Sequence, residues 1–174
     1  MKNKFMRTLV GTFLGLLLLF SCMQISVSAQ SSEQNKVRFL DENFGPGIEG
    51  VWRTRITQLN CQTGVVIRIF KGLITFAQGG TIAETSNASA PAFRSPGHGL
   101  WEKQSSRTYF GAFVFQLFNP NGSFAGTQKI SQTYQLSLFG DTFSSIGTIQ
   151  ISDPNDNIMA NGCATATATR FELR

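Results

Sequence analysis

Short β-forming segments separated by turn residues fill the chain from Glu49 onward. The segments are rich in Val, Ile, Thr, Phe and Tyr, and the residues between them include Gly, Asn and Asp, a pattern typical of strands joined by turns. No stretch carries apolar residues at the spacing that would place them on one face of a helix over three turns. The sequence therefore predicts an all-β domain.

Eight such segments can be counted, and most of the links between them are only a few residues long. The expected strands cover residues 50–59, 64–76, 80–86, 98–104, 107–118, 123–137, 142–152 and 158–172. Links this short make sequential strands antiparallel neighbours, which gives an up-and-down meander. The exception is 87–97, a longer link with two prolines that we expect to fold over one end of the domain. Such a meander can form an open sheet, a sandwich or a closed barrel, and closure removes the exposed edges.

Residues at the two ends of the β region favour closure. The first expected strand opens with Gly50-Val51-Trp52, and the last carries Arg170. This resembles the lipocalin and wider calycin pattern, in which a Trp plugs the floor of the barrel and a basic residue of the last strand lies across its ring. A guanidinium there stacks on the indole and donates its N–H groups to nearby carbonyls. The resemblance implies an eight-stranded antiparallel up-and-down β-barrel with structural roles for Gly50, Trp52 and Arg170.

The resemblance covers the layout from Gly50 to Phe171, but its motifs lie only at the two ends. The chain has no clear match to the middle lipocalin motifs, and its layout is also similar to avidin-like, nitrobindin-like and allene oxide cyclase barrels. These resemblances imply two uses: binding of a small hydrophobic molecule, or cyclisation or isomerisation of a hydrophobic substrate. A barrel filled by its own side chains and acting as a surface interaction module is the third alternative, and without an assigned catalytic group we favour a protein that is not an enzyme.

Two cysteines give an independent indication of closure. If Trp52 lies opposite Arg170 in antiparallel strands, Cys61 and Cys163 lie within one diagonal step of each other, and both point outward by strand parity. We expect a disulfide that fastens the last strand to the first in an oxidising compartment. Two free thiols are the alternative.

The first 29 residues have the features of a secretory signal. Three cationic residues, an apolar stretch and a small-residue cleavage site follow one another: Lys2, Lys4 and Arg7, then residues 9–20, then Val27-Ser28-Ala29. The apolar stretch is shorter than the roughly 20 residues that a membrane helix needs. We therefore expect a signal peptide over 1–29, a flexible segment over 30–48 and the barrel over 49–174, with the protein secreted or periplasmic in a bacterium.

The leader also allows a second interpretation. Leu19-Phe20-Ser21-Cys22 resembles the lipobox of bacterial lipoproteins, with the bulky Phe20 as a departure from it. In that case Cys22 becomes lipidated and anchors the protein to a membrane. Either form of processing removes Lys2, Lys4 and Arg7, which reduces the formal net charge from +5 to about +2. A small, dispersed positive excess on an exported protein argues against a nucleic-acid partner.

Strand parity also predicts the inside of the barrel. Ala164, Ala166 and Ala168 share the inward face of Arg170, and three small side chains in a row leave room for a cavity. An eight-stranded barrel either holds one small ligand or is filled by its own side chains, and both remain open. The expected ligand-binding residues are Trp52, Ile56, Tyr109, Phe113, Phe115, Gln128 and Tyr134.

Few residues offer catalytic or metal chemistry. Glu84 and Glu102 lie within β segments, and either one inside the barrel would serve as a general acid or base with a pKa raised by apolar walls. The alternative is a pair of surface carboxylates. His98 is the single histidine, which excludes a His-rich metal site. A structural or solvated role is favoured for it, with a lone axial haem ligand as the alternative, and no metal or other cofactor is expected.

Overall fold

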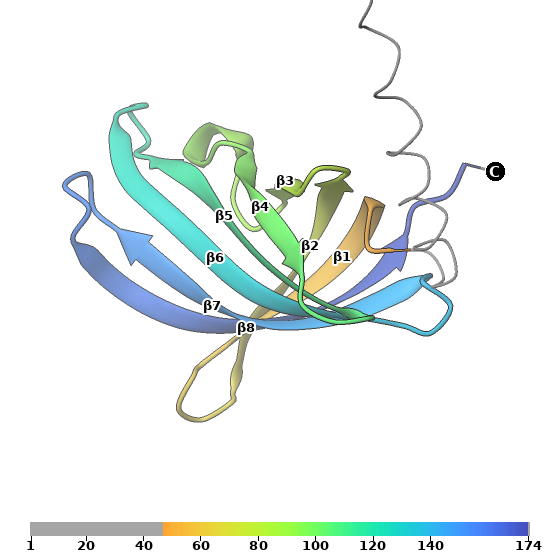
Figure 1. Ribbon diagram of the computed structural model, residues 1–174. Coiled ribbons are helices and arrows are strands. Elements are labelled where there is room, and N and C mark those ends of the chain that lie inside the picture. The colour runs from red at the N-terminus through yellow and green to blue at the C-terminus, as the bar shows by residue number, and fades with distance from the viewer. Residues whose placement is uncertain (1–46, 174) are drawn as a thin grey trace, which may run out of the picture. The chain divides into compact units, whose positions relative to one another are not determined.

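Residues 47–173, the part of the chain described by our computed structural model, contain a closed antiparallel barrel of eight strands (Figure 1). The strands are β1 (Gly50–Leu59), β2 (Val66–Ala77), β3 (Thr81–Ser86), β4 (Gly97–Lys103), β5 (Thr108–Phe118), β6 (Phe124–Leu136), β7 (Thr142–Ser152) and β8 (Ile158–Arg170). Each strand pairs with its neighbours in sequence, and β8 returns to β1. The predicted all-β fold, strand number and up-and-down order are confirmed.

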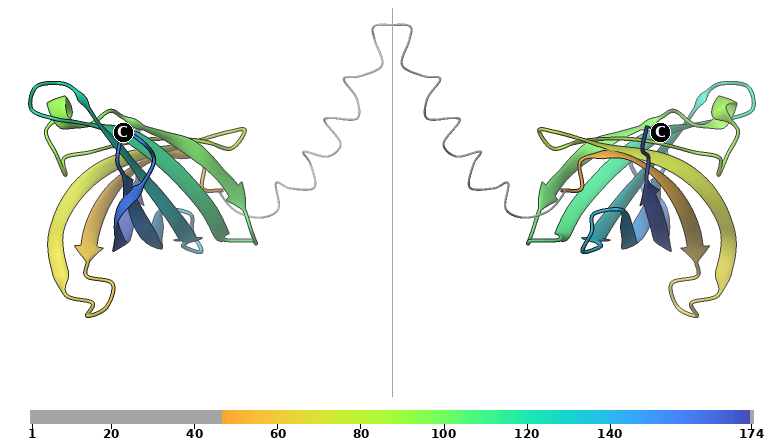
Figure 2. Two further views of the ribbon diagram at one scale, coloured as in Figure 1. Left: turned by 90° about the vertical axis from the view of Figure 1, so that its left-hand side faces the viewer. Right: turned by 90° about the vertical axis from the view of Figure 1, so that its right-hand side faces the viewer.

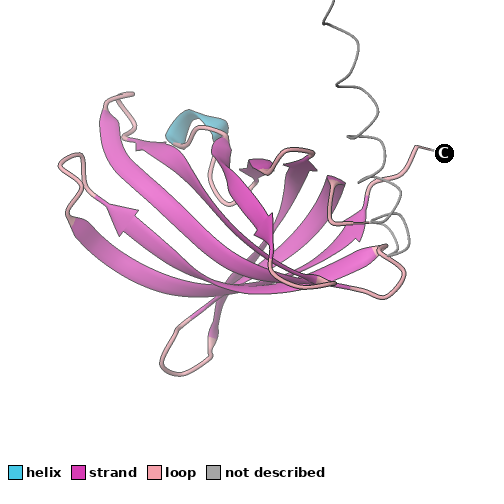
Figure 3. Cartoon of the chain, in the orientation of Figure 1, coloured by secondary structure: helices cyan, strands magenta, loops and turns pink. Residues whose placement is uncertain are grey.

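The N-terminal predictions lie outside the described residues. The signal peptide over 1–29, the lipobox ending at Cys22 and almost all of the segment 30–48 precede residue 47. Within 47–173, no helix is long and apolar enough to span a membrane. The one helical element of this range is a short 3₁₀ helix, η1 (Pro91–Phe93), in the long link between β3 and β4 (Figure 3).

The pairing of β1 with β8 closes the barrel. Its register places Trp52 opposite Arg170 and continues without interruption to Leu59 opposite Cys163. Just beyond the end of β1, Cys61 forms a disulfide with Cys163, with 5.2 Å between their Cα atoms. The predicted register and disulfide are therefore both confirmed. A link across 102 residues restricts the unfolded chain and stabilises the fold by about 2–5 kcal/mol.

The strands curve around one interior whose two ends differ (Figure 2). We call the end where β1 begins and β8 finishes the Trp52 end; the links after β2, β4 and β6 lie there. The opposite end, which we call the loop end, carries the links after β1, β3, β5 and β7 and therefore includes both the disulfide and the 87–96 link.

Trp52 and Arg170 seal the Trp52 end. The Trp52 side chain is fully buried, and its Nε1–H donates a hydrogen bond to the Ile48 carbonyl at 2.8 Å. The Arg170 guanidinium carbon lies 4.2 Å from the indole centroid. Its nitrogens donate to the carbonyls of Gly47, Glu49 and Gly140, so one side chain ties the chain before β1 to the turn before β7.

Gly50 makes this arrangement possible. Its φ of +124° lies in a region that L side chains rarely adopt, and a Cβ there would lie 2.9 Å from Arg170 Nη1. The glycine of the Gly50-Val51-Trp52 motif thus leaves room for the guanidinium beside the start of β1.

Alternation along the strands separates the core from the outer surface. Thr54 and Ile56 follow Trp52 on its face, and Ala164, Ala166 and Ala168 are each at most 6% exposed. Uninterrupted alternation along β6 would place Phe124 on the same face as the buried Ile130 and Tyr134, but Phe124 is 42% exposed. It lies at the strand end where a bulge shifts the β5–β6 register, and this irregularity interrupts the alternation.

We expect Arg170→Met to lower the free energy of unfolding by about 2–4 kcal/mol, because it removes the stacking on Trp52 and leaves three carbonyls without their donors. Arg53→Met is the matched control, since Arg53 also lies over a ring, that of Phe171, but is solvent-exposed. It should cost less than about 1 kcal/mol. Urea denaturation measures both; equal losses would contradict the role assigned to Arg170.

Candidate functional site

A cavity of about 80 Å³ lies inside the barrel. It has room for several water molecules or a small organic group. Apolar side chains from six strands line it: Ile56, Phe70, Ile74, Phe113, Phe115, Leu117, Ile130, Phe143, Ile149, Ala164 and Ala166. The polar lining consists of Thr54, Gln58, Arg68, Glu84, Ser86, Ser89, Arg94, Gln128, Gln132 and Tyr134. The interior is therefore neither completely filled nor purely apolar.

The cavity owes its space to the small residues of β8. Ala164 and Ala166 are both buried and line it. Phe113 and Phe115, on β5, also line it. Larger side chains at the alanine positions would occupy the cavity, so this strand determines how much of the interior is left open.

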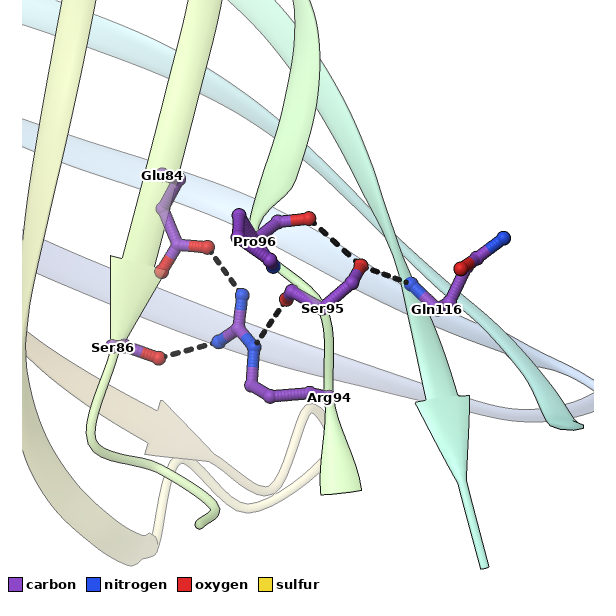
Figure 4. A network of polar contacts seen from close by, with 6 residues as sticks. All are labelled: Glu84, Ser86, Arg94, Ser95, Pro96 and Gln116. Carbon is purple, nitrogen blue, oxygen red and sulfur yellow. Dashed lines mark hydrogen bonds and ion pairs between the residues drawn. The ribbon is translucent and has the colours of Figure 1, made fainter. Parts of the chain in front are cut away.

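An ion pair between Glu84 and Arg94 forms the most polar part of the lining (Figure 4). Arg94 Nη2 donates to Glu84 Oε2 at 2.6 Å, and Nη1 donates to the Ser86 hydroxyl at 2.6 Å. The Arg94 side chain is only 6% exposed and the Glu84 side chain only 10%. The Arg94 guanidinium also lies 3.7 Å from the ring centroid of Phe115. Both charges are thus compensated within a largely dehydrated site.

The 87–96 link holds Arg94 in this position. The Ser95 backbone N–H donates to the Gln116 carbonyl. In return, the Gln116 N–H donates to the Ser95 hydroxyl, which itself donates to the Pro96 carbonyl (Figure 4). Arg94 additionally forms an isolated bridge with Leu117 of β5. The link therefore returns along β5 as an ordered segment, and the Arg94 side chain turns from it toward the interior.

Glu84 reaches the cavity because its neighbour on β4 has no side chain. β3 places Glu84 opposite Gly97. A Cβ on Gly97 would lie 3.1 Å from Glu84 Oε2 and 2.9 Å from Phe113 Cδ2. Burial raises the pKa of Glu84 above its ordinary value, and the charge and hydrogen bonds of Arg94 only partly oppose this effect.

Tyr134 contributes a buried hydroxyl to the same cavity. The residue is 1% exposed, and its ring meets Phe76 and Phe143 edge to face. Its Oη has no hydrogen-bond partner among residues 47–173. Burial and the nearby charge of Glu84 both raise the pKa of Tyr134, so the phenol stays protonated and is available as a donor.

The structure brings most of the residues predicted for ligand binding to this cavity. Ile56, Phe113, Phe115, Gln128 and Tyr134 line it. Trp52 and Tyr109 are buried but are not part of the lining. Trp52 instead seals the Trp52 end.

The two candidate carboxylates lie in different environments. Glu84 lines the cavity, whereas Glu102 is exposed on the outer surface of β4. His98 is also exposed. Among residues 47–173, no group of three or more His, Cys, Asp or Glu side chains is placed to hold a metal ion.

Sequence reasoning missed Arg94 and Gln132. Gln132 is 7% exposed and has the same strand parity as Tyr134, so the alternation of β6 already contained this signal. Arg94 lies in a link, where alternation assigns no face. Its two flanking prolines, Pro91 and Pro96, indicate a restricted backbone but not an inward side chain.

No family model and no curated protein matches this chain.

We expect the stability of the wild type relative to Glu84→Gln to fall as the pH rises above 4.5, the ordinary pKa of this carboxyl. With its pKa raised in the folded state, Glu84 holds its proton more tightly there than in the unfolded chain. Between pH 4.5 and the raised pKa, the unfolded chain loses this proton while the folded protein keeps it, and the free energy of unfolding therefore falls. Thermal unfolding between about pH 4.5 and pH 8 measures this difference.

Glu102→Gln is the control, since it removes an exposed carboxylate from the adjacent strand and should follow the wild type. A relative stability of the wild type that increases with pH would mean that the attraction of Arg94 outweighs the burial of Glu84.

Proposed function

We propose that this barrel binds a small hydrophobic molecule in its interior. The observation that carries the proposal is the cavity between the small side chains of β8 and the aromatic side chains of β5. Cavities with mainly apolar walls and a few converging polar groups are typical of small-molecule sites. At about 80 Å³, the cavity suits a ring or a short chain, with any longer part of the ligand extending toward the loop end.

The ligand would reach the cavity from the loop end. Trp52 and Arg170 close the other end, whereas Ala88 and Ser89 of the 87–96 link belong to the cavity lining. Arg68, also in the lining, is solvent-exposed and donates to the Ala88 carbonyl and the Gln58 side chain. The rim is therefore polar, and the apolar walls lie deeper.

We also propose that the protein functions outside the reducing cytoplasm, secreted or in a periplasm. The disulfide between Cys61 and Cys163 is consistent with an oxidising compartment. The cationic, apolar and small-residue segments of the leader support export. Lipidation at Cys22 would instead keep the same barrel tethered to a membrane.

A second candidate function, isomerisation or cyclisation of the bound molecule, is favoured by the position of Glu84. A cavity-lining carboxyl with a raised pKa is suited to remove a proton from a substrate and return it elsewhere. Gln128 and Tyr134 would orient the substrate. The test is whether the wild type catalyses exchange of solvent hydrogen into a bound ketone. Exchange that is lost in Glu84→Gln would support this role. If the wild type shows no exchange, ligand binding remains the only proposed function.

Ala166→Leu should abolish binding of toluene and of C6–C10 alkan-2-ones, because the larger side chain fills the cavity. Thr165→Leu adds a similar side chain at the adjacent exposed position of β8 and should bind like the wild type. Isothermal titration calorimetry measures the affinities, and circular dichroism verifies both folds. An absence of saturable binding to the wild type would contradict the proposed function, and unchanged binding to Ala166→Leu would place the site elsewhere.

A further inference from the structure

The polar groups of the cavity differ in what they can still bind. Glu84 and Arg94 neutralise one another, whereas the Tyr134 hydroxyl lies buried with no partner among the described residues. Buried polar groups in folded proteins are nearly always hydrogen-bonded, so an unpartnered hydroxyl lining a cavity points to a group that the protein itself does not supply.

Arg94 is poorly suited to receive an anion. Its guanidinium donates to Glu84, to Ser86 and, through Nε at 3.2 Å, to the Ser95 carbonyl. One of its faces lies against the Phe115 ring. A carboxylate brought to this arginine would also meet the carboxylate of Glu84, and repulsion between two like charges is strong in a dehydrated site.

Arg68 is the other basic residue of the lining, and it lies at the rim. It is exposed to solvent, and its guanidinium already donates to Gln58 and to the Ala88 carbonyl. Attraction between an exposed charge and an anionic head group is weak and screened by salt. The rim therefore gives an anion little advantage over a neutral molecule.

Tyr134 requires an acceptor. Its phenol is a donor held among the rings of Phe76 and Phe143, and a ligand oxygen with a free lone pair would satisfy it. The amides of Gln128 and Gln132 add uncharged polar groups to the same cavity. This part of the site is suited to a carbonyl, ether or hydroxyl oxygen on an otherwise apolar molecule.

Resting on the proposed function, we infer that the ligand is an uncharged oxygenated hydrophobic molecule whose oxygen accepts a hydrogen bond from Tyr134, and that Glu84 excludes anions by occupying Arg94. The site thus selects against carboxylates, such as free fatty acids, by having its own carboxylate in place.

The test compares the binding of 2-octanone, octanoate and toluene to the exported protein by calorimetry. It is carried out at about pH 8, where octanoate is ionised. We expect 2-octanone to bind the wild type at least about tenfold more tightly than octanoate. Tyr134→Phe should weaken the binding of 2-octanone by about five- to tenfold. The same variant should bind toluene, which has no oxygen, as tightly as the wild type does.

Glu84→Gln should remove the preference against octanoate, because it leaves Arg94 without its anion. Octanoate should then bind the variant at least about tenfold more tightly than it binds the wild type. Glu102→Gln, on the outer face of β4, should not change octanoate binding.

The outcomes separate this inference from the proposed function. If none of the three probes binds, the proposed function fails. If toluene binds but octanoate binds the wild type as tightly as 2-octanone, or Tyr134→Phe leaves 2-octanone unchanged, the inferred selectivity is overturned while the cavity site stands. A gain in octanoate affinity with Glu102→Gln equal to that with Glu84→Gln would also overturn it, since the effect would then be one of net charge.

Discussion

The pairing of β1 with β8 is the contact on which the rest of the structure depends, because it turns a meander of strands into a single enclosed interior. Its two ends are secured differently. At one end Arg170 covers the buried indole of Trp52 and donates to carbonyls before β1 and before β7. At the other end the Cys61–Cys163 disulfide makes the closure covalent. Both ends of this pairing are thus fixed, and between them β8 contributes small buried side chains, Ala164, Ala166 and Ala168, to the interior.

Closure also determines the chemistry of the inside. Water is largely excluded from Glu84 and Arg94, so their attraction is strong, but so is the cost of dehydrating them. A barrel that only needed a stable core would gain as much from apolar side chains of similar size. The ion pair is instead held by an ordered link, shares its cavity with the unpartnered Tyr134 hydroxyl and has space beside it provided by Gly97. This combination supports the proposed binding of a ligand in the interior.

Strand alternation explains why much of this could be predicted from the sequence. Trp52, Arg170 and the two cysteines define one register between the first and last strands, and the alanines of β8 follow from it by parity. Ile56, Phe113 and Tyr134 were identified as interior residues in the same way. Residues at which the alternation is interrupted, or which lie outside the strands, could not be predicted in this way. Phe124 lies beside a bulge at the start of β6, and Arg94 reaches the interior from a link whose path depends on hydrogen bonds to β5 that no local pattern reveals. The choice between Glu84 and Glu102 likewise depended on the exact register of two short strands.

A crystal structure of the wild-type protein with 2-octanone bound would show whether an uncharged oxygenated molecule is held inside the barrel by Tyr134. We expect the ketone inside the barrel, with its carbonyl oxygen within hydrogen-bonding distance of Tyr134 Oη, its chain against Ala164 and Ala166, and the Glu84–Arg94 pair intact. A ketone bound only on the outer surface, or one that enters the barrel and separates Glu84 from Arg94 while Tyr134 stays unpartnered, would contradict this expectation.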